Sequence, residues 1–269
     1  MGMKFFEKNK IDLDLGDQVT ITVTDGVATN SGQDFVDNLR NRRNDSGWAT
    51  TDSTDAGNTT LIVEFGDLVE FDRLIILQHN WKAYTIKRWN GSSYVDFSTP
   101  INVSGNTLIN KLHEFSAVEA EKIQIVITQT MLADDDKQAA QLIVTRFIGE
   151  FVMQPKISDI RIGKNRKSLK ALSGKIKVMR SSGAVDLKLQ QKSVVSDADL
   201  DLLELLHDYH QGFLMWICGG NTEQFRNQRI GYREHDFYLV NITSEYQPEW
   251  HEGFFRQGID VEFRLAEAI

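Results

Sequence analysis

Histidine and aspartate residues stand at spacings that could bind a metal ion in two places along this chain. His207 and His210 lie three residues apart in a helical pattern, so both would fall on one face of a helix. Asp134, Asp135 and Asp136 form an acidic run, and Ca²⁺ prefers several carboxylate oxygens. However, the histidines have no further ligands at metal-site spacing, and the helix dipole alone stabilises histidine in a last turn. The acidic run lacks the spaced ligands of an EF-hand, so we predict no bound metal and no cofactor.

Motifs for covalent or acid–base catalysis are missing from the sequence. It contains no Gly-x-Ser-x-Gly, no phosphate-binding loop and no Ser-His-Asp pattern. Cys218 is the one cysteine, and it ends an apolar run that begins at Phe213. That setting is typical of a small buried hydrophobe, because a reactive thiol needs a cationic or helix N-terminal environment. We therefore assign no catalytic residues and expect a protein that is not an enzyme.

Charge is divided unevenly along the chain, whose formal net charge is −8. Residues 1–152 hold 14 Lys and Arg against 22 Asp and Glu, whereas residues 153–269 hold 16 of each kind. The acidic first half argues against specific nucleic-acid recognition, because binding to phosphates depends on Lys and Arg. A basic stretch in the second half could face nucleic acid in a tube lumen, but it is more typical of a solvated loop or an inter-subunit contact. Its members are Lys164, Arg166, Lys167, Lys170, Lys175 and Lys177.

The first half reads as short strands separated by turns. Residues 18–24 alternate apolar and polar side chains and end at Asp25-Gly26, which is a hairpin signal. Further strand-like runs follow at 61–65, 71–77, 84–89, 94–97, 122–127 and 142–148. No long helical period interrupts them, a pattern that favours a β-sandwich or jelly roll over residues 1–152.

The second half, residues 153–269, predicts an α+β domain that begins near Pro155. Residues 174–180 and 184–189 alternate apolar with charged side chains around a Ser-Ser-Gly turn, which predicts a hairpin. Ser196 can cap a helix whose apolar face carries Leu202, Leu205 and Leu206. Strands are expected at 213–218, 237–242 and 259–265. The whole chain is therefore expected to be mainly β, with a jelly roll followed by a hairpin, one helix and three strands.

The order of features over residues 30–150 resembles that of discoidin-type domains, which are also called factor 5/8 C-terminal-like or galactose-binding-like. The resemblance starts at the segment Asn44-Asp45-Ser46-Gly47-Trp48 and continues through the strand 60–66. The strand 74–77, the turn Trp89-Asn90-Gly91-Ser92-Ser93-Tyr94 and the closing strands 123–127 and 142–148 follow in that order. The cysteine pair of many extracellular members is absent here. The resemblance implies a jelly roll whose end loops hold a ligand, often a sugar on an aromatic ring.

Trp81 is the aromatic residue that best fits this implied sugar site. It follows His79 and Asn80 after a strand, and the resembling topology places Arg40, Arg42 and Arg43 nearby, so these five residues are the further candidate ligand-binding residues. The alternative is that Trp81 closes one end of the barrel or meets a neighbouring subunit. Trp48 and Trp89 are predicted to lie in the core.

The layout of residues 155–269 resembles the ring-forming domains of phage tail tubes and distal tail proteins. The leading hypothesis is therefore a minor tail or baseplate subunit of a phage or phage-derived particle, with the jelly roll outside a homo-oligomeric ring. Its partners would be other tail proteins and a host glycan, and it would be assembled in the host cytoplasm and located in the virion tail. The alternatives are a stand-alone carbohydrate-binding module and an accessory domain of a glycan-active enzyme. No segment of about 18 apolar residues or signal-peptide core is found, so we expect no membrane insertion.

Overall fold

The chain divides into two compact units in a computed structural model. Unit 2 comprises Glu7–Phe147, and unit 1 combines Met1–Phe6 with Ile148–Ile269. Because Met1–Phe6 belongs with the later residues, unit 2 is an insertion into unit 1, which the predicted division at 152/153 did not foresee. The structure describes residues 3–25, 33–41, 47–50, 57–133, 135–151, 156–162, 165–170, 176–181, 185–191, 196–208, 213–216, 237–242, 249–250 and 257–268.

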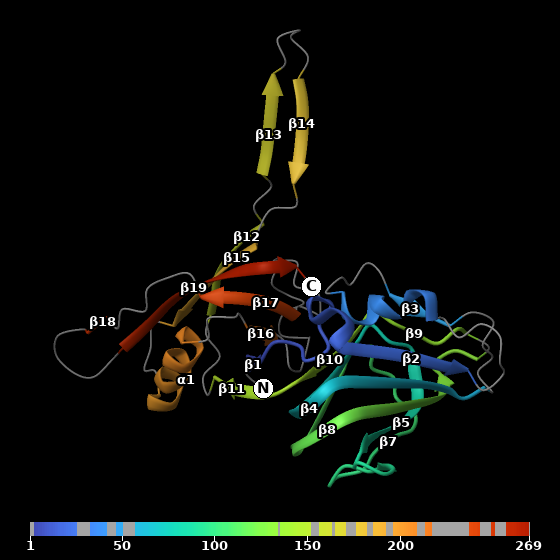
Figure 1. Cartoon of the computed structure of the whole chain (residues 1–269). Helices are drawn as coiled ribbons and strands as arrows, with labels where there is room; N and C mark the ends of the chain where they lie inside the picture. The colour runs from blue at the N-terminus through green and yellow to red at the C-terminus, as the bar shows by residue number, and fades with distance from the viewer. Residues whose placement is uncertain are drawn as a thin grey trace. The chain divides into compact units, whose positions relative to one another are not determined.

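Unit 2 is built from antiparallel strands around two long ones, β4 (Thr59–Leu77) and β8 (Lys111–Thr130) (Figure 1). Its main sheet has the order β10-β4-β8-β5-β6, where the other members are β10 (Gln141–Thr145), β5 (Trp81–Trp89) and β6 (Tyr94–Val95). β2 (Val19–Asp25) also pairs with β4, and β7 (Ile101–Val103) pairs with β5. A small second sheet joins β3 (Trp48–Ala49) to β9 (Gln138–Ala139). Two 3₁₀ helices, η1 (Leu13–Gln18) and η2 (Gln33–Arg40), complete the described part.

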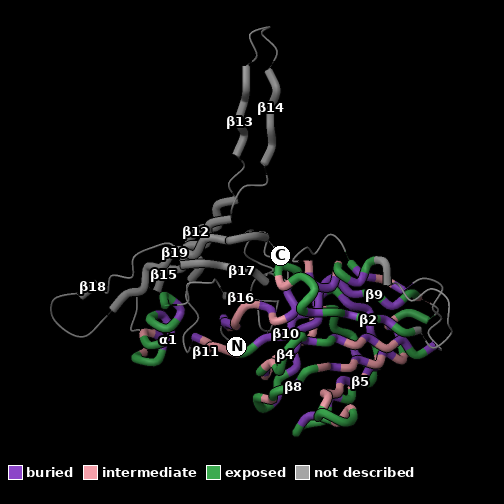
Figure 2. Tube along the Cα trace, in the orientation of Figure 1, coloured by how far each residue is buried: buried purple, intermediate pink, exposed green. Residues whose placement is uncertain are grey.

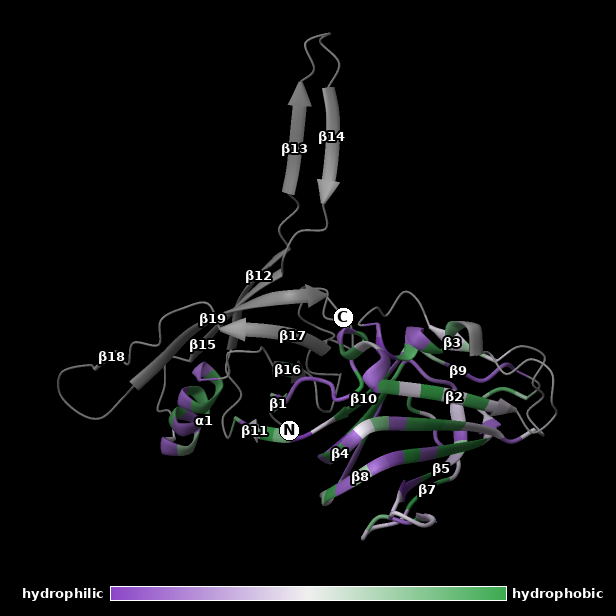
Figure 3. Cartoon of the chain, in the orientation of Figure 1, coloured by the Kyte–Doolittle hydropathy of each residue, from purple (hydrophilic) through white to green (hydrophobic). Residues whose placement is uncertain are grey.

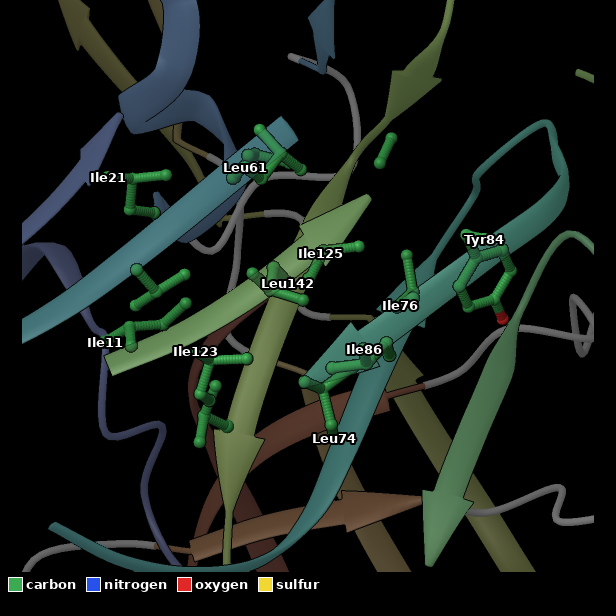
Figure 4. Close-up of a cluster of buried hydrophobic side chains, with 14 of the residues drawn as sticks. Ile11, Ile21, Leu61, Leu74, Ile76, Tyr84, Ile86, Ile123, Ile125 and Leu142 are labelled. Carbon is green, nitrogen blue, oxygen red and sulfur yellow. The ribbon is translucent and has the colours of Figure 1, made fainter. Parts of the chain in front are cut away.

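Alternation of apolar and polar residues gives these strands one buried and one solvated face. On β8, Ile123, Ile125 and Ile127 are fully buried, while the residues between them are half-exposed. The pattern can be followed in the burial and hydropathy views (Figures 2 and 3). The inward side chains of β2, β4, β5, β8 and β10 form one hydrophobic cluster (Figure 4). The predicted fold class, mainly β with a sandwich of antiparallel strands, is confirmed.

Two predicted strands turn out to be one. Runs 61–65 and 71–77 were expected to be separated by a turn at Gly66-Asp67, but both belong to β4. The pairing of β4 with β8 shifts register between Glu64 and Val69, so the strand bends without ending. Its first part pairs with β2 and its last part with β10, which explains its length.

Unit 1 contains a sheet of order β11-β1-β16-β17-β19-β15-β12. The strands are β11 (Phe147–Glu150), β1 (Lys4–Phe6), β16 (Phe213–Trp216), β17 (Phe237–Ile242), β19 (Gln257–Ala268), β15 (Val185–Gln191) and β12 (Lys156–Ile162), and β18 (Glu249–Trp250) pairs with β19. The chain leaves this sheet after β1 and returns at β11, which is the neighbour of β1. Both ends of the inserted unit are therefore anchored in adjacent strands.

The hairpin predicted between residues 174–180 and 184–189 is wrong. β14 (Ile176–Ser181) pairs with β13 (Asn165–Lys170), and β15 pairs instead with β12 and β19. A β13–β14 hairpin is thus nested between β12 and β15, and it forms a two-stranded sheet of its own. Alternation identified the strands, but partner choice depends on residues that are distant in sequence.

The predicted helix is confirmed as α1 (Asp197–His207). Ser196 is its N-cap, and its hydroxyl accepts a hydrogen bond from the backbone N–H of Asp199 at 3.2 Å. Leu202, Leu203 and Leu206 are buried on one face, whereas Leu205, which was expected on that face, is exposed. A Cβ on Gly149 would overlap Leu202. Within the described residues, no helix has both the length and the apolar character needed to cross a membrane.

Candidate functional site

Trp81 is completely buried and is the first residue of β5, so the expectation of an exposed loop aromatic is corrected. The pairing of β5 with β8 is irregular between Trp81 and Tyr84. That irregularity allows both rings to face the core although they are three residues apart. Trp81 makes edge-on contacts with Tyr84 at 5.7 Å and with Trp48 at 6.5 Å. It therefore closes the end of the core, as the alternative interpretation stated, and Trp48 is buried as predicted.

His79 is also buried, and it serves the backbone around Trp81. Its Nδ1 accepts a hydrogen bond from the backbone N–H of Trp81 at 3.1 Å. Burial lowers the pKa of His79 to about 3, with a smaller contribution from nearby His113 and Lys111. Burial likewise lowers the pKa of His113 to about 4, and this residue shares a 2.9 Å hydrogen bond with the Tyr84 hydroxyl. Both imidazoles are therefore neutral near pH 7 and act as core residues.

Asn80 fastens two segments together. Its Nδ2 donates to Asp135 Oδ2 at 3.1 Å and to the carbonyl of Asp136 at 2.7 Å, while its Oδ1 accepts from the backbone N–H of Gln138 at 3.0 Å. The acidic run considered for calcium is thus used here as a hydrogen-bond partner of Asn80, and Asp134 lies outside the described residues. No group of three or more potential metal ligands occurs within the described part of the chain.

Of the three predicted arginines the structure describes Arg40, and the contacts of its guanidinium are with η2 and η1. Arg40 is buried at the end of η2, where its guanidinium contacts Asp37 at 2.9 Å and the carbonyl of Gly16 at 3.2 Å. These contacts fix η2 against η1. Arg42 and Arg43 lie outside the described residues, as does His210.

Beside Asn80, the end of the sandwich carries an open cavity of about 320 Å³. It is lined by Gly47, Trp48, Ala49, Gln78, Gln138, Ala139 and Ala140. Four of these residues are small, so they leave space above the buried Trp48 ring. Gln78 and Gln138 are exposed, and their carboxamides have no hydrogen-bond partner among the described residues. The described residues that line the cavity include no charged side chain.

Gln78 holds an unusual backbone conformation at this cavity. Its φ is 49°, and it is the one non-glycine residue with positive φ in the part that the structure describes. The backbone N–H of Gln78 donates to Asn110 Oδ1 at 2.7 Å, which holds the turn in place. Such strain costs of order 1–3 kcal/mol and is concentrated at functional sites in proteins. The sequence contained no signal for this cavity, because its residues come from three distant segments.

Trp89 also differs from the expectation that it lies in the core. It is half-buried at the end of β5, and its ring contacts that of Tyr94 at 5.0 Å. On β5, Tyr84 and Ile86 are buried and Thr85 and Lys87 are half-exposed, so the alternation places Trp89 on the outer face. The sequence did contain this signal.

No protein-family model matches the chain, and no curated protein matches it. Among solved structures, it is similar to chitosan-binding module 1 of a chitosanase/glucanase from Paenibacillus sp. IK-5, with 14% identity and a TM-score of 0.41 over 51% of this chain and 98% of that one. It is also similar to a family 32 carbohydrate-binding module of Clostridium perfringens NanJ, with 17% identity and a TM-score of 0.36 over 54% and 99%. A Ruminococcus gnavus fucosidase is similar with 17% identity and a TM-score of 0.40. The match covers 51% of this chain but only 27% of the enzyme. The similar structures include carbohydrate-binding modules, at identities and TM-scores too low to assign a function to this chain.

Proposed function

We propose that unit 2 is a glycan-binding module of the discoidin-like, galactose-binding-like type, and that its ligand enters the cavity beside Gln78 and Gln138. The observation that carries this proposal is the open cavity of about 320 Å³ with two carboxamides that have no hydrogen-bond partner among the described residues. That volume falls at the lower end of the range of about 300–1,000 Å³ that is usual for small-molecule sites. A single sugar residue at the end of a glycan suits such a site.

The chemistry of the lining favours a neutral, hydroxyl-rich ligand. A carboxamide offers both N–H donors and carbonyl acceptors, which match hydroxyl groups that donate and accept. Phosphate or carboxylate ligands instead call for Arg, Lys or a helix N-terminus, and the part of the lining that the structure describes contains none of these. Because Gly47, Ala49 and Ala140 have small side chains or none, a sugar ring in the cavity could contact both glutamines.

Titration calorimetry of the full chain against a panel of neutral mono- and disaccharides tests the proposal. We expect binding by at least one sugar, and a loss of about fivefold to tenfold in affinity for Gln78→Ala or Gln138→Ala, because each removes about one hydrogen-bonding group. Gln129→Ala on β8 is the matched control, since Gln129 is exposed but does not line the cavity. The absence of binding across the panel, or equal binding by all variants, would contradict the proposal.

A second candidate is the structural role of a tail or baseplate subunit in a homo-oligomeric ring, located in a virion and without enzymatic activity. The observation that favours it lies in unit 1. β11 and β12 are the terminal strands of its sheet, and β13–β14 pairs with no other strand that the structure describes. Isolated two-stranded hairpins are marginally stable in water, and free strand edges are pairing sites. Mass photometry of the purified chain should give a closed multimer, and a monomer at micromolar concentration would count against this role.

A further inference from the structure

A row of four side chains crosses the outer face of the main sheet of unit 2. Glu64 on β4 lies opposite Lys122 on β8, and Trp89 on β5 lies opposite Tyr94 on β6. Arg88 pairs with Ile123, so the next position along β5, Trp89, falls beside Lys122. Strands are about 4.8 Å apart, and the row therefore spans about 14 Å. This row shares no residue with the described lining of the Gln78–Gln138 cavity.

The aromatic half of the row is joined by a hydrogen-bonded turn. Asn90 Oδ1 accepts hydrogen bonds from the backbone N–H groups of Ser92 and Ser93, at 3.0 and 2.8 Å. Gly91 has a φ of 96°, a conformation that suits glycine. The turn thus fixes Trp89 and Tyr94 as a pair, with ring centroids 5.0 Å apart and planes inclined at 64°. Both rings stay half-exposed, so part of their apolar surface faces solvent.

Polar groups that have no partner in the described part of the chain lie next to this pair. Lys122 is engaged by Glu64 at 2.6 Å, but neither the Lys87 ammonium nor the Gln124 carboxamide has a partner among the described residues. Lys87 and Gln124 lie opposite one another in the register. Lys87 is two residues before Trp89 on β5, so both side chains lie on the same face of the sheet. No unpaired carboxylate belongs to this group of residues.

The rest of the face is rich in hydroxyl groups. Threonines line it on β2, β4 and β5, and Ile62 and Val126 are the apolar residues among them. The threonines are Thr20, Thr22, Thr24, Thr60 and Thr85. A protein interface would present a wider apolar centre. Two aromatic rings surrounded by hydroxyl and amide groups instead match a ligand that has small apolar faces and many hydroxyl groups.

We propose that this face is a second binding site, for an extended glycan strand. One sugar ring would pack its C–H face on Trp89 and Tyr94, and Lys87 and Gln124 would bind the hydroxyl or carboxylate oxygens of the neighbouring sugar residue. The site is independent of the cavity, which suits a single sugar residue. Two sites on one module would allow one polymer, or two, to be bound with increased avidity.

Affinity electrophoresis of the full chain in native gels tests the site, with hydroxyethyl cellulose as the neutral polymer and polygalacturonate as the acidic one. We expect at least one polymer to retard the wild type, and Trp89→Ala or Tyr94→Ala to raise the apparent Kd by about tenfold. Lys87→Ala should weaken retardation more in polygalacturonate, because it removes the charge that attracts a carboxylate.

Two controls separate this site from the cavity and from packing effects. Phe35→Ala removes an exposed aromatic ring of η2 and should leave retardation unchanged. The Gln78→Ala/Gln138→Ala double variant should also retain polymer binding, even if it no longer binds small sugars. Unchanged retardation of Trp89→Ala, or no retardation of the wild type by either polymer, would overturn the inference. A wild-type dimer that Trp89→Ala dissociates would instead make this face a contact between two copies and would overturn it as well.

Discussion

Asn80 and Gln138 are joined by two hydrogen bonds: the backbone N–H of Gln138 donates to Asn80 Oδ1 at 3.0 Å, and the backbone N–H of Asn80 donates to the Gln138 carbonyl at 3.2 Å. A residue predicted to bind ligand therefore lies behind the cavity and sets the position of a residue that lines it. At the proposed glycan site, the side chain of Asn80 would therefore act on a ligand only through Gln138.

Replacement of Asn80 by Ala should destabilise unit 2 by about 2–3 kcal/mol, because it removes three hydrogen bonds of a mostly buried side chain. Sugar affinity should fall with it, since Gln138 loses its anchor. Urea unfolding followed by tryptophan fluorescence measures the first effect and calorimetry the second. Asn102→Ala, at an exposed position of β7, is the control and should change stability by less than about 0.5 kcal/mol.

Trp81→Ala should lower the free energy of unfolding by about 3–5 kcal/mol, as expected when a large ring is removed from a closed core. The ring contacts with Trp48 and Tyr84 would be lost together. Trp89→Ala is the matched comparison, and it should cost about 1 kcal/mol or less because that ring is half-exposed. Equal costs in urea titrations would show that the burial of Trp81 has been misassigned.

Gly66→Ala should destabilise unit 2 by about 1–3 kcal/mol. A Cβ at this position would stand 2.8 Å from the backbone oxygen of Gln18, which is too close for two non-bonded atoms. Because that oxygen belongs to the main chain, the bend of β4 has to move to relieve the overlap. Asp67→Ala, at the neighbouring exposed position, should have little effect in the same thermal unfolding assay.

Acid should weaken unit 2 through His79 and His113. Both pKa values are lowered in the folded state, to about 3 and about 4 from 6.5, so the unfolded chain binds more protons below pH 6.5. The stability linked to these groups is complete above pH 6.5 and is lost as the pH falls toward the folded pKa values. Between pH 7 and pH 5 the loss is about 2 kcal/mol for each histidine.

Urea titrations at pH 7 and pH 5 check this dependence. In the His79→Gln and His113→Gln variants, the difference in unfolding free energy between pH 7 and pH 5 should be smaller by about 2 kcal/mol, the contribution of one histidine. His207→Gln, on the exposed side of α1, should preserve the wild-type difference. If all variants show the same pH dependence, the carboxylates and not these two imidazoles control the acid response.

The strands and the helix were largely predictable because their signals are local. Alternation along residues 18–24 and 122–127 identified β2 and the last part of β8, and Ser196 with the following aspartates marked the start of α1. The outward position of Trp89 was also available from the alternation of β5. These features depend on neighbours within a few residues, and one sequence contains all of that information.

Tertiary structure alone decided which residues meet. The irregular pairing of β5 with β8 turns the Trp81 side chain toward the core, and no local sequence pattern predicts such a bulge. β14 pairs with β13 and not with β15, because strand pairing depends on contacts across the whole sheet. The cavity joins residues 47–49, 78 and 138–140, three segments that the chain brings together only when the sandwich closes. The sequence by itself thus determined the elements and their solvated faces, whereas the fold decided the site.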